Sequence, residues 1–464
     1  MTKKANWKSS RNALVRLVLA LGLGSGLVAC GGGGGGASNT LSEHSRFSIS
    51  GISSGLIGSG LVLQNNAEDT LTITGNGSFT FPTPVPNGAS YRVSVYRQPT
   101  TPPQACTVTN RTGQATAAVM NVAVNCVIPV GRFAYVANGN GGVSAYRIDA
   151  GSGALTQLAG SPFAAGTSPR AVTVDPTGKF AYVANAGSRN ISAYTIDASS
   201  GALTQMVGSP LTTGASSDSL TVDPTGRFAY LASASGVWAY ALNASTGMLT
   251  QLAGSPFASG TDPGAIAIDP AGQFAYVTNR EGYIWAYRID ANTGALVQIA
   301  GSPFALEGIP GSLTVDPTGK FVYVTNLYLP GRVSRLWAYR INSSSGALTQ
   351  VAGSPYDAGS LVAAVATDPS GRFVYAVSQR GGRITAHRID ASSGALTQIP
   401  GSPFETGPES VSLSIDPMGK FAYVTSLGES KVSIYTIDPN TGALTSVGET
   451  KIELSAPWSI VTTR

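Results

Sequence analysis

Charged residues are scarce in this chain. Asp, Glu, Lys and Arg make up 11% of its 464 residues, about half the usual fraction. The net charge of +5 comes from the N-terminus, because residues 1–16 hold five of the 29 basic residues and the other 24 balance the 24 acidic residues. Without that segment the chain is neutral and has no basic surplus for a nucleic-acid-binding face.

Histidine and cysteine are also rare. The two histidines are His44 and His387, and the three cysteines are Cys30, Cys106 and Cys126. They form no cluster with the spacing of a zinc site, and no loop is dense enough in Asp to predict calcium binding. The glycine run after Cys30 matches GxGxxG, but no strand precedes it, so a dinucleotide site is excluded. We therefore expect no metal and no cofactor.

Helical periodicity is missing from every long stretch, whereas Gly, Ser and Thr are abundant, with 57 copies of Gly alone. This composition indicates an all-β exported protein whose surface is built from hydroxyl and amide groups. At 464 residues the chain is too long for one ordinary core, so we expect two or more folded units.

The N-terminus has the layout of a secretory signal. Basic residues 1–16 precede an apolar run at 17–29, which is too short for a stable transmembrane helix. The run ends in LVAC, which resembles the bacterial lipobox and implies cleavage before Cys30 and lipidation of that residue; several acyl chains would hold the protein at a membrane. Gly31 rather than Asp follows Cys30, which by family analogy favours the outer membrane, on its periplasmic or surface face. The alternative is a plain signal peptide with an incidental cysteine.

Residues 30–45 predict a flexible glycine-rich tether, and residues 46–128 predict a small β-sandwich that serves as a spacer. In the second segment, short alternating runs such as TLTITG and YRVSVY are separated by turn-rich pieces, as in small sandwiches. Cys106 and Cys126 both lie here, and an exported protein would pair them in a disulfide worth about 3 kcal/mol; a reduced pair is the alternative. GISSG at 51–55 matches GxSxG but lacks the strand-to-helix turn of a nucleophile elbow.

A phrase of the form DPxGxFxYVxN recurs along the rest of the chain. Its phenylalanine falls at Phe133, Phe180, Phe228, Phe274, Phe321, Phe373 and Phe421. Seven units with a period near 48 residues predict a propeller or an array. Each unit contains a strand, a DPTG-type turn, a second and a third strand, and a short fourth strand followed by GSP, which is the pattern of a four-stranded blade.

The first of these units begins at residue 131 with its second strand and has no first strand. The C-terminal stretch from Pro457 to Thr462 is similar to SPRAVTV at the head of the second unit. We therefore predict an all-β fold in which residues 131–464 form a seven-bladed β-propeller that its C-terminal strand closes. A ring is needed because one blade alone cannot bury both of its faces.

The recurring phrase and the GSPF that ends most blades resemble the lactonase-type seven-bladed propeller family. This family includes bacterial 6-phosphogluconolactonases, fungal muconate cycloisomerases and surface proteins with YVTN repeats, and YVTN occurs here at 276–279 and 323–326. The resemblance covers residues 131–464 and implies the fold. It implies an activity less directly, because the matching residues belong to the scaffold.

Function is expected where the blades differ. In such a propeller the loops between the second and third strands share one face with the loops that enter the next blade. The first set carries Arg189, Arg280, Arg332, Arg335 and Arg380, and the second carries Asp218, Asp262, Glu307, Asp357, Glu405 and Glu409. Arginines directed at one mouth suit a carboxylate or phosphate ligand. The alternative is that they are solvated and paired with those acids.

Catalytic candidates are few. The fungal enzymes that the resemblance points to act through a His with Arg and Glu, but His44 lies in the tether and His387 stands where six other units have Tyr, which indicates packing. Glu307 remains as a candidate base for ring opening by water. Trp238, Trp285 and Trp337 share one register and are interpreted as filler between blades rather than a stacking platform for sugars.

We therefore expect a monomeric, membrane-anchored propeller lipoprotein of the cell envelope that binds a small anionic ligand or an envelope protein. The alternative function is that of a lactonase, similar to 6-phosphogluconolactonase, which hydrolyses a small anionic lactone.

Overall fold

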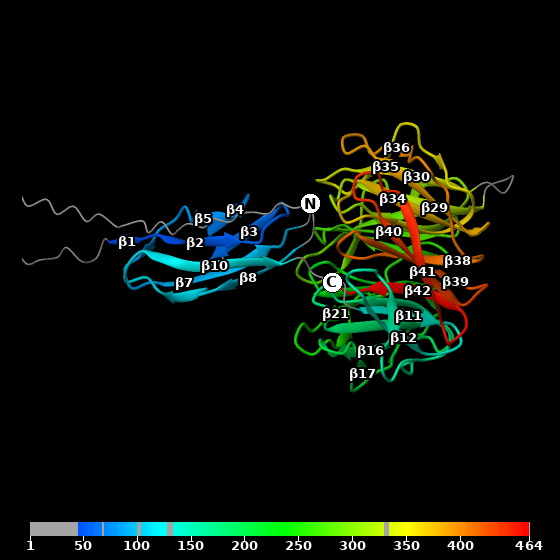
Figure 1. Cartoon of the computed structure of the whole chain (residues 1–464), viewed down its shortest axis with the longest axis horizontal. Helices are drawn as coiled ribbons and strands as arrows, with labels where there is room; N and C mark the ends of the chain where they lie inside the picture. Colours follow the sequence, from blue (N-terminus) through cyan, green and yellow to red (C-terminus); the bar gives the residue numbers. More distant parts are fainter. Residues whose placement is uncertain (1–44, 67–68, 100–103, 128–132, 329–333, 464) are drawn as a thin grey trace, which may run out of the picture. The chain divides into compact units, whose positions relative to one another are not determined.

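The computed structural model describes residues 45–66, 69–99, 104–127, 133–328 and 334–463. Two groups of strands account for these residues, β1–β10 and β11–β42 (Figure 1). Across these ranges no helix is long and apolar enough to cross a membrane. The predicted signal segment, Cys30, the tether up to residue 44 and Arg332 lie outside the described residues.

The first group of strands forms a small β-sandwich. One sheet has the order β5-β2-β10-β8 and the other β4-β3-β7-β9, while β1 pairs with β6. The strands are β1 (Arg46–Phe47), β2 (Ile49–Ser54), β3 (Leu61–Asn65), β4 (Asp69–Ile73), β5 (Gly77–Thr80), β6 (Val85–Pro86), β7 (Ser90–Arg97), β8 (Ala105–Thr109), β9 (Thr112–Gln114) and β10 (Val119–Val127). Their inward side chains, including Leu63, Val93 and Val124, form one core.

The sandwich contains the expected disulfide, between Cys106 on β8 and Cys126 on β10. The GISSG segment is not a nucleophile elbow. Its Ser53 lies within strand β2, is 2% exposed and donates its hydroxyl to the carbonyl of Gly75 at 2.8 Å.

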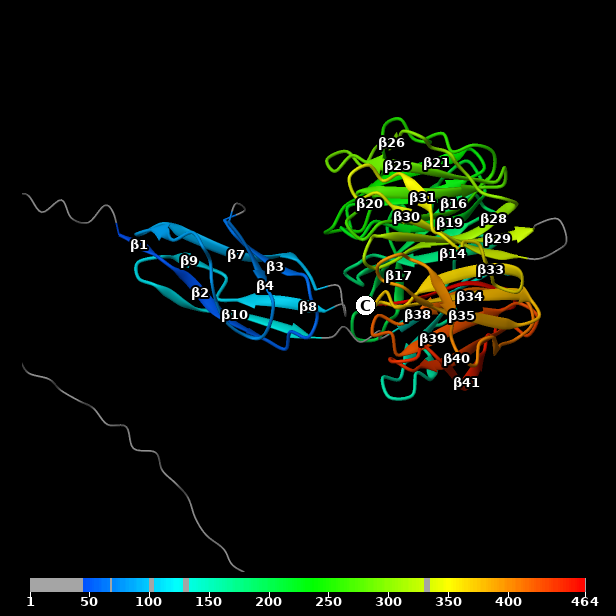
Figure 2. The same ribbon diagram turned by 90° about the horizontal axis from the view of Figure 1, so that it is seen from above.

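The second group of strands forms seven antiparallel sheets, which are the blades of the predicted propeller (Figures 1 and 2). From first to fourth strand, blade 1 consists of β42 (Pro457–Thr462), β11 (Phe133–Asn138), β12 (Val143–Ile148) and β13 (Leu155–Gln157). Blade 2 consists of β14 (Pro169–Val174), β15 (Phe180–Asn185), β16 (Asn190–Ile196) and β17 (Leu203–Gln205). Blade 3 consists of β19 (Ser217–Val222), β20 (Phe228–Ser233), β21 (Gly236–Leu242) and β22 (Leu249–Gln251).

The other four blades repeat this order. Blade 4 consists of β23 (Pro263–Ile268), β24 (Phe274–Asn279), β25 (Tyr283–Ile289) and β26 (Leu296–Gln298), and blade 5 of β28 (Ile309–Val315), β29 (Phe321–Tyr328), β30 (Arg335–Ile341) and β31 (Leu348–Gln350). Blade 6 consists of β33 (Ser360–Thr367), β34 (Phe373–Arg380), β35 (Arg383–Ile389) and β36 (Leu396–Gln398), and blade 7 of β38 (Ser410–Ile415), β39 (Phe421–Ser426), β40 (Lys431–Ile437) and β41 (Leu444–Lys451). Short strands β18 (Leu211–Thr212), β27 (Phe304–Ala305), β32 (Tyr356–Asp357) and β37 (Phe404–Glu405) pair with the third strands of blades 2, 4, 5 and 6.

The C-terminal strand closes the ring, as predicted. β42 pairs antiparallel with β11, with Tyr135 opposite Val461 (Figure 1). Just beyond β42, Thr463 exchanges two hydrogen bonds with Phe133: the Phe133 amide donates to its hydroxyl at 3.1 Å, and its own amide donates to the Phe133 carbonyl at 2.9 Å. The strand missing from the first unit is therefore supplied from the other end of the chain.

The Asp of the recurring phrase stabilises the turn between the first and second strands through hydrogen bonds to backbone amides. In blade 3, Asp223 is 2% exposed, and its carboxylate accepts hydrogen bonds from the amides of Arg227 at 2.8 Å and Phe228 at 2.7 Å. The Gly226 amide closes the turn on the Asp223 carbonyl at 2.9 Å. A buried carboxylate is tolerated here because backbone donors satisfy it.

The Tyr, Phe and Gly of the repeat join each blade to the next. A tyrosine of each second strand donates its hydroxyl to the carbonyl of a glycine in the following blade, at 2.6–3.3 Å. The pairs are Tyr135–Gly201, Tyr182–Gly247, Tyr230–Gly294, Tyr276–Gly346, Tyr323–Gly394, Tyr375–Gly442 and Tyr423–Gly153. The last pair links blade 7 to blade 1, so the series has no end.

Two constraints, backbone conformation and close packing, require glycine at these positions. Gly294 has a φ of +73°, a conformation that disfavours any side chain. A Cβ at this position would also lie 2.8 Å from Leu252 Cδ1 and closer still to the Phe228 ring of the preceding blade. The phenylalanine of one blade therefore packs directly over the glycine backbone of the next.

Gly294→Ala should lower the free energy of unfolding by about 3 kcal/mol, because it adds an overpacked contact to the backbone strain. Gly214→Ala is the matched control, since Gly214 has a φ of +72° and no atom within 4 Å of the point that a Cβ would occupy; it should cost only about 1 kcal/mol of backbone strain. Denaturant unfolding of both variants measures the difference. Equal losses would contradict the packing role of Gly294.

Candidate functional site

The described arginines that were predicted to bind a ligand lie on four different blades. Arg280 follows β24, and its Nε lies 2.8 Å from an Asp262 carboxylate oxygen, with both side chains largely exposed. Arg335 stands opposite Asp357 in the pairing of β30 with β32. Arg189 adopts a φ of +55° in the loop after β15, and Arg380 ends β34 opposite Ser360.

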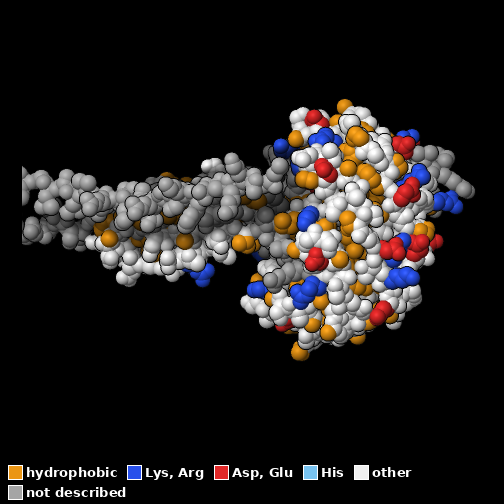
Figure 3. All heavy atoms as spheres, viewed as in Figure 1, with side chains coloured by type: hydrophobic (Ala, Val, Ile, Leu, Met, Phe, Trp, Pro, Cys, Tyr) orange, Lys and Arg blue, Asp and Glu red, His pale blue; other side chains and the backbone are white. Residues whose placement is uncertain are grey.

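Each of these arginines lies at the end of a strand or in the loop beside it. None of the four arginines lines the hollow beside Tyr91 and Val119 in the sandwich or the hollow beside Ser433 and Tyr435 in blade 7. Basic and acidic side chains alternate over the propeller face that Figure 3 shows, without a patch of one sign. Glu307, the candidate base, is exposed in the loop before β28, and its backbone carbonyl accepts a hydrogen bond from Asn326 Nδ2 at 3.0 Å.

The first strands of neighbouring blades lie beside one another around the ring. In each first strand, the residue after the one that stands opposite the sixth residue of the second strand marks one level of the ring. In blades 1 to 7 these residues are Trp458, Arg170, Asp218, Gly264, Gly311, Ala363 and Val411. Large polar or aromatic side chains therefore occupy blades 1 to 3, and small or aliphatic ones occupy blades 4 to 7. This level is asymmetric although the scaffold is repetitive.

Arg170 and Trp458 form a stacked pair at this level. The Arg170 guanidinium carbon lies 3.8 Å from the centre of the Trp458 ring, well within the range of a cation–π contact. A Cβ on Gly139 would lie 2.7 Å from Trp458 Nε1, so glycine is needed there for the indole to fit. The pair thus joins the closing strand β42 to the first strand of blade 2.

Arg170 has unused hydrogen-bonding capacity. Its Nε is buried and has no hydrogen-bond partner, and the same is true of the side-chain carbonyl oxygens of Asn138 and Asn185. These asparagines stand opposite Pro457 and Pro169, each one residue before a member of the stacked pair. Buried polar atoms without partners are rare in folded proteins and call for an explanation; a bound ligand with polar groups of its own would supply one.

Arg170 and Trp458 were not predicted as site residues, because function was expected in the loops. Both residues lie within first strands, where the repeat predicts scaffold. The signal was nevertheless present: aligning the seven first strands shows Arg and Trp at a position where four blades have Gly, Ala or Val.

His387 lies in the slot that tyrosine occupies in the other six blades. It is 3% exposed, its Nδ1 has no hydrogen-bond partner, and its ring centre lies 6.4 Å from that of Tyr356. Burial lowers the pKa of His387 to about 4, although the nearby Asp357 carboxylate opposes this shift. A buried, neutral imidazole of this kind serves packing rather than proton transfer near pH 7.

His387→Tyr should remove a pH-dependent part of the stability. The pKa of His387 falls from 6.5 in the unfolded chain to about 4 in the folded one, so the unfolded state binds the extra proton between these values. The free energy of unfolding therefore keeps its full value above pH 6.5 and falls by roughly 3 kcal/mol as the pH drops towards 4. Denaturant unfolding of both proteins at pH 7 and pH 4.5 measures it. A difference between the two that does not vary with pH would contradict the burial of a neutral His387.

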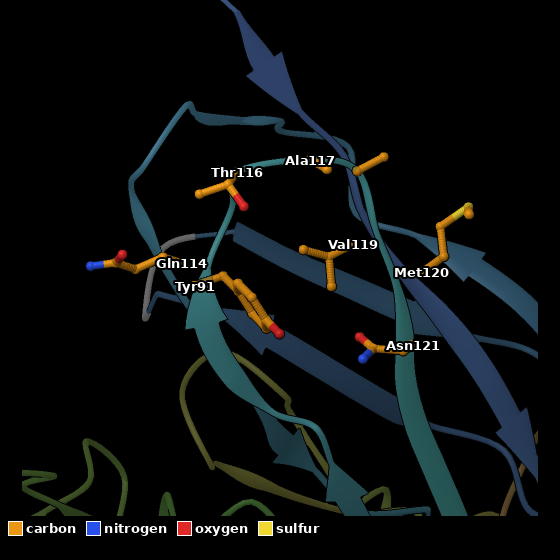
Figure 4. Close-up of a pocket in the computed structure, with 8 residues that line it drawn as sticks. Tyr91, Gln114, Thr116, Ala117, Val119, Met120 and Asn121 are labelled. Carbon is orange, nitrogen blue, oxygen red and sulfur yellow. The ribbon is translucent and has the colours of Figure 1, made fainter.

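The sandwich has a hollow of its own, of about 430 Å³. Figure 4 shows Tyr91, Gln114 and Val119 on its walls, and its remaining lining residues are Thr116, Ala117, Ala118, Met120 and Asn121. None of these side chains is charged. The hollow therefore does not suit the anionic ligand that the loop arginines predicted.

Comparison with known proteins bears on the propeller. A family model described as lactonase, 7-bladed β-propeller matches residues 95–218, 210–362 and 352–462. No curated protein sequence matches the chain. Among solved structures, a protein from Bacteroides fragilis described as a candidate 6-phosphogluconolactonase is 20% identical, with a TM-score of 0.60 over 72% of this chain and 98% of its own.

Two further structures have the same fold. The periplasmic gluconolactonase of Pseudomonas aeruginosa is 19% identical, with a TM-score of 0.58 over 72% of this chain and 99% of its own. A protein from Lactobacillus plantarum is 17% identical, with a TM-score of 0.58 over the same shares. At such identities the likeness concerns the fold, and the active-site residues must be argued from this chain.

Proposed function

We propose, since the chain belongs to the lactonase family of seven-bladed β-propellers, that it is an envelope propeller that binds a small anionic ligand against the stacked pair of Arg170 and Trp458. One observation carries the proposal: a buried arginine nitrogen without a partner lies against an indole ring. Such an arrangement has a donor available for a ligand and a flat apolar wall beside it.

The chemistry favours a carboxylate on a hydroxyl-rich skeleton. A guanidinium binds a carboxylate through two parallel hydrogen bonds, and an indole face packs against the C–H groups of a sugar-like ligand. The residues Gly264, Gly311 and Ala363 at the same level carry no charge that would compete for the ligand. An aldonate has these features, and so does the lactone from which it forms.

Arg170→Ala should weaken the binding of gluconate by about 10- to 100-fold, because it removes charge-assisted hydrogen bonds worth about 1.5–3 kcal/mol. Isothermal titration of the purified protein without its first 30 residues measures the affinity. Arg280→Ala is the control, since Arg280 pairs with Asp262 on the exposed rim, and it should leave the affinity unchanged. Weaker binding in Arg280→Ala, with Arg170→Ala unaffected, would place the ligand on the rim instead.

A second candidate function is lactone hydrolysis, which the family match favours. One of the solved structures with this fold is a periplasmic gluconolactonase, so export to the cell envelope is compatible with lactone hydrolysis. A carboxylate would take a proton from water while the water oxygen attacks the lactone carbonyl; the ring C–O bond then breaks and the ring oxygen takes up the proton. Asp218, an exposed carboxylate at the level of Arg170 on the next blade, fits this role better than Glu307.

Hydrolysis separates the two candidate functions. If the protein is a lactonase, it should open glucono-1,5-lactone or 6-phosphogluconolactone faster than the spontaneous rate, followed by acid release at constant pH. Asp218→Asn should then abolish turnover, whereas Glu307→Gln should retain it. Gluconate binding without any turnover would identify a binding module and exclude the lactonase.

We further propose that lipid on Cys30 holds the protein at the outer membrane, as the lipobox-like LVAC indicates. Several acyl chains on one residue anchor a protein stably where a single chain does not. Cys30→Ala should therefore move the protein from the membrane pellet to the soluble fraction after cell lysis. Retention in the pellet would mean that another part of the chain provides the anchor.

A further inference from the structure

The hollow in the sandwich lies where strand β10 loses a neighbour. β8 pairs with β10 only from Ala123 onwards, because the chain turns away after Thr109 and enters β9, which pairs with β7 of the other sheet. The residues of β10 before Ala123 therefore have no strand on that side. The hollow of about 430 Å³ opens at this point, and its lining residues come from both sheets.

A β-bulge in β10 shapes one wall of the hollow. Two residues of β10, Met120 and Asn121, stand in the register where β2 has a single residue. Bulges redirect side chains and are common beside functional sites. Both bulge residues line the hollow, and Met120 is 73% exposed.

Gly113 keeps the facing wall uncovered. It stands opposite Tyr91 in the pairing of β9 with β7, and a Cβ there would lie 2.8 Å from Tyr91 Cε1 and 2.9 Å from the Tyr91 hydroxyl. Any other residue would therefore cover or displace the hydroxyl end of the ring. Figure 4 shows Tyr91, Val119 and Asn121 directed at the same space.

The polar side chains of the hollow have hydrogen-bonding capacity to spare. Within the described part of the chain, the side-chain amides of Gln114 and Asn121 and the hydroxyl of Thr116 form no hydrogen bond. The Tyr91 hydroxyl makes one long hydrogen bond, to the carbonyl of Asn110 at 3.4 Å. Two amides and two hydroxyls can thus both donate to a ligand and accept from it.

The lining of the hollow is uncharged, and Ala117, Ala118 and Val119 give it small apolar contacts. A neutral ligand is therefore favoured, because a charged group would lose hydration without gaining a charged partner. An acetamido group fits this mixture. Its N–H and C=O need an acceptor and a donor, which an amide side chain supplies together, and its methyl group needs an apolar contact.

The sheet face beside the hollow is uncharged as well. Ile52 of β2, Ala123 and Asn125 of β10, and Thr107 and Thr109 of β8 lie side by side on it. No outward residue of these three strands carries a charge. A neutral polymer that enters the hollow with one unit can therefore continue over this face.

A peptide strand is the less suitable occupant. Strand addition needs free backbone donors and acceptors along an edge, but the Asn121 carbonyl already accepts a hydrogen bond from Asn110 Nδ2 at 2.9 Å. Recognition at this place therefore falls to the side-chain amides and hydroxyls.

We propose that this hollow binds an N-acetylhexosamine residue of an uncharged glycan. The acetamido group lies against Ala117 and Val119 and takes its hydrogen bonds from Gln114 and Asn121. The volume of the hollow is within the range of small-ligand sites, about 300–1,000 Å³. The sandwich is then a glycan-binding domain, and its site does not depend on the ligand proposed for the propeller.

Asn121→Ala tests the proposal with little risk to the fold, since Asn121 is exposed. Saturation-transfer NMR of the protein without its first 30 residues should detect binding of methyl N-acetylglucosaminide, and the variant should bind about 5- to 10-fold more weakly. Asn125→Ala, on the same strand and sheet face but outside the hollow, is the matched control and should bind this monosaccharide as the parent does. Ala117→Trp should abolish binding, because the ring fills the hollow. Arg170→Ala should bind normally, which separates this site from that of the propeller.

The ligand itself provides a second test. Methyl glucoside, which has a hydroxyl in place of the acetamido group, should bind about 10-fold more weakly, and triacetylchitotriose should bind more tightly than the monosaccharide. The proposal is overturned if no N-acetylated sugar binds, if methyl glucoside binds equally well, or if folded Asn121→Ala and Ala117→Trp bind undiminished. A trimer that binds no more tightly than the monosaccharide would contradict a glycan, and equal binding of acetylalanine methylamide would assign the hollow to a peptide instead.

Discussion

The propeller depends on one repeated contact, in which a tyrosine hydroxyl of each blade reaches a glycine carbonyl of the next. The contact forms because the glycine has a positive φ and no side chain, so the phenylalanine of the preceding blade can lie directly on its backbone. It recurs at all seven junctions, including the junction of blade 7 with blade 1. Each blade then has a neighbour for both of its faces, which a blade outside a ring cannot have.

The shortage of charge follows from how this fold satisfies its polar groups. Turns are closed by a buried Asp that accepts backbone amides, as Asp223 does, and junctions are closed by tyrosine hydroxyls. Several rim charges are paired with others on the same or a neighbouring element, such as Arg280 with Asp262 and Arg383 with Glu405. Exposed pairs of this kind contribute little to stability, so the blades are held by burial and by hydrogen bonds to the backbone.

Against such a uniform scaffold, the informative residues are those that break the repeat. Arg170 and Trp458 break it at the second position of the first strand, and their stacking leaves a buried donor without a partner. Residues that cost the scaffold some hydrogen bonding therefore create a surface on which a ligand can act.

The fold could be predicted from the sequence because the repeat encodes it locally. The DPxG turn, the alternating strand and the glycine at the third turn determine each blade, and the unmatched first unit together with the Pro457–Thr462 stretch predicted the closing strand with its correct bounds. The candidate site could not be predicted in the same way. Whether Arg170 meets Trp458, which lies on the strand from the other end of the chain, depends on which blades become neighbours when the ring closes. Local sequence determines the shape of a blade, but only the closed ring brings side chains from different blades within reach of one another.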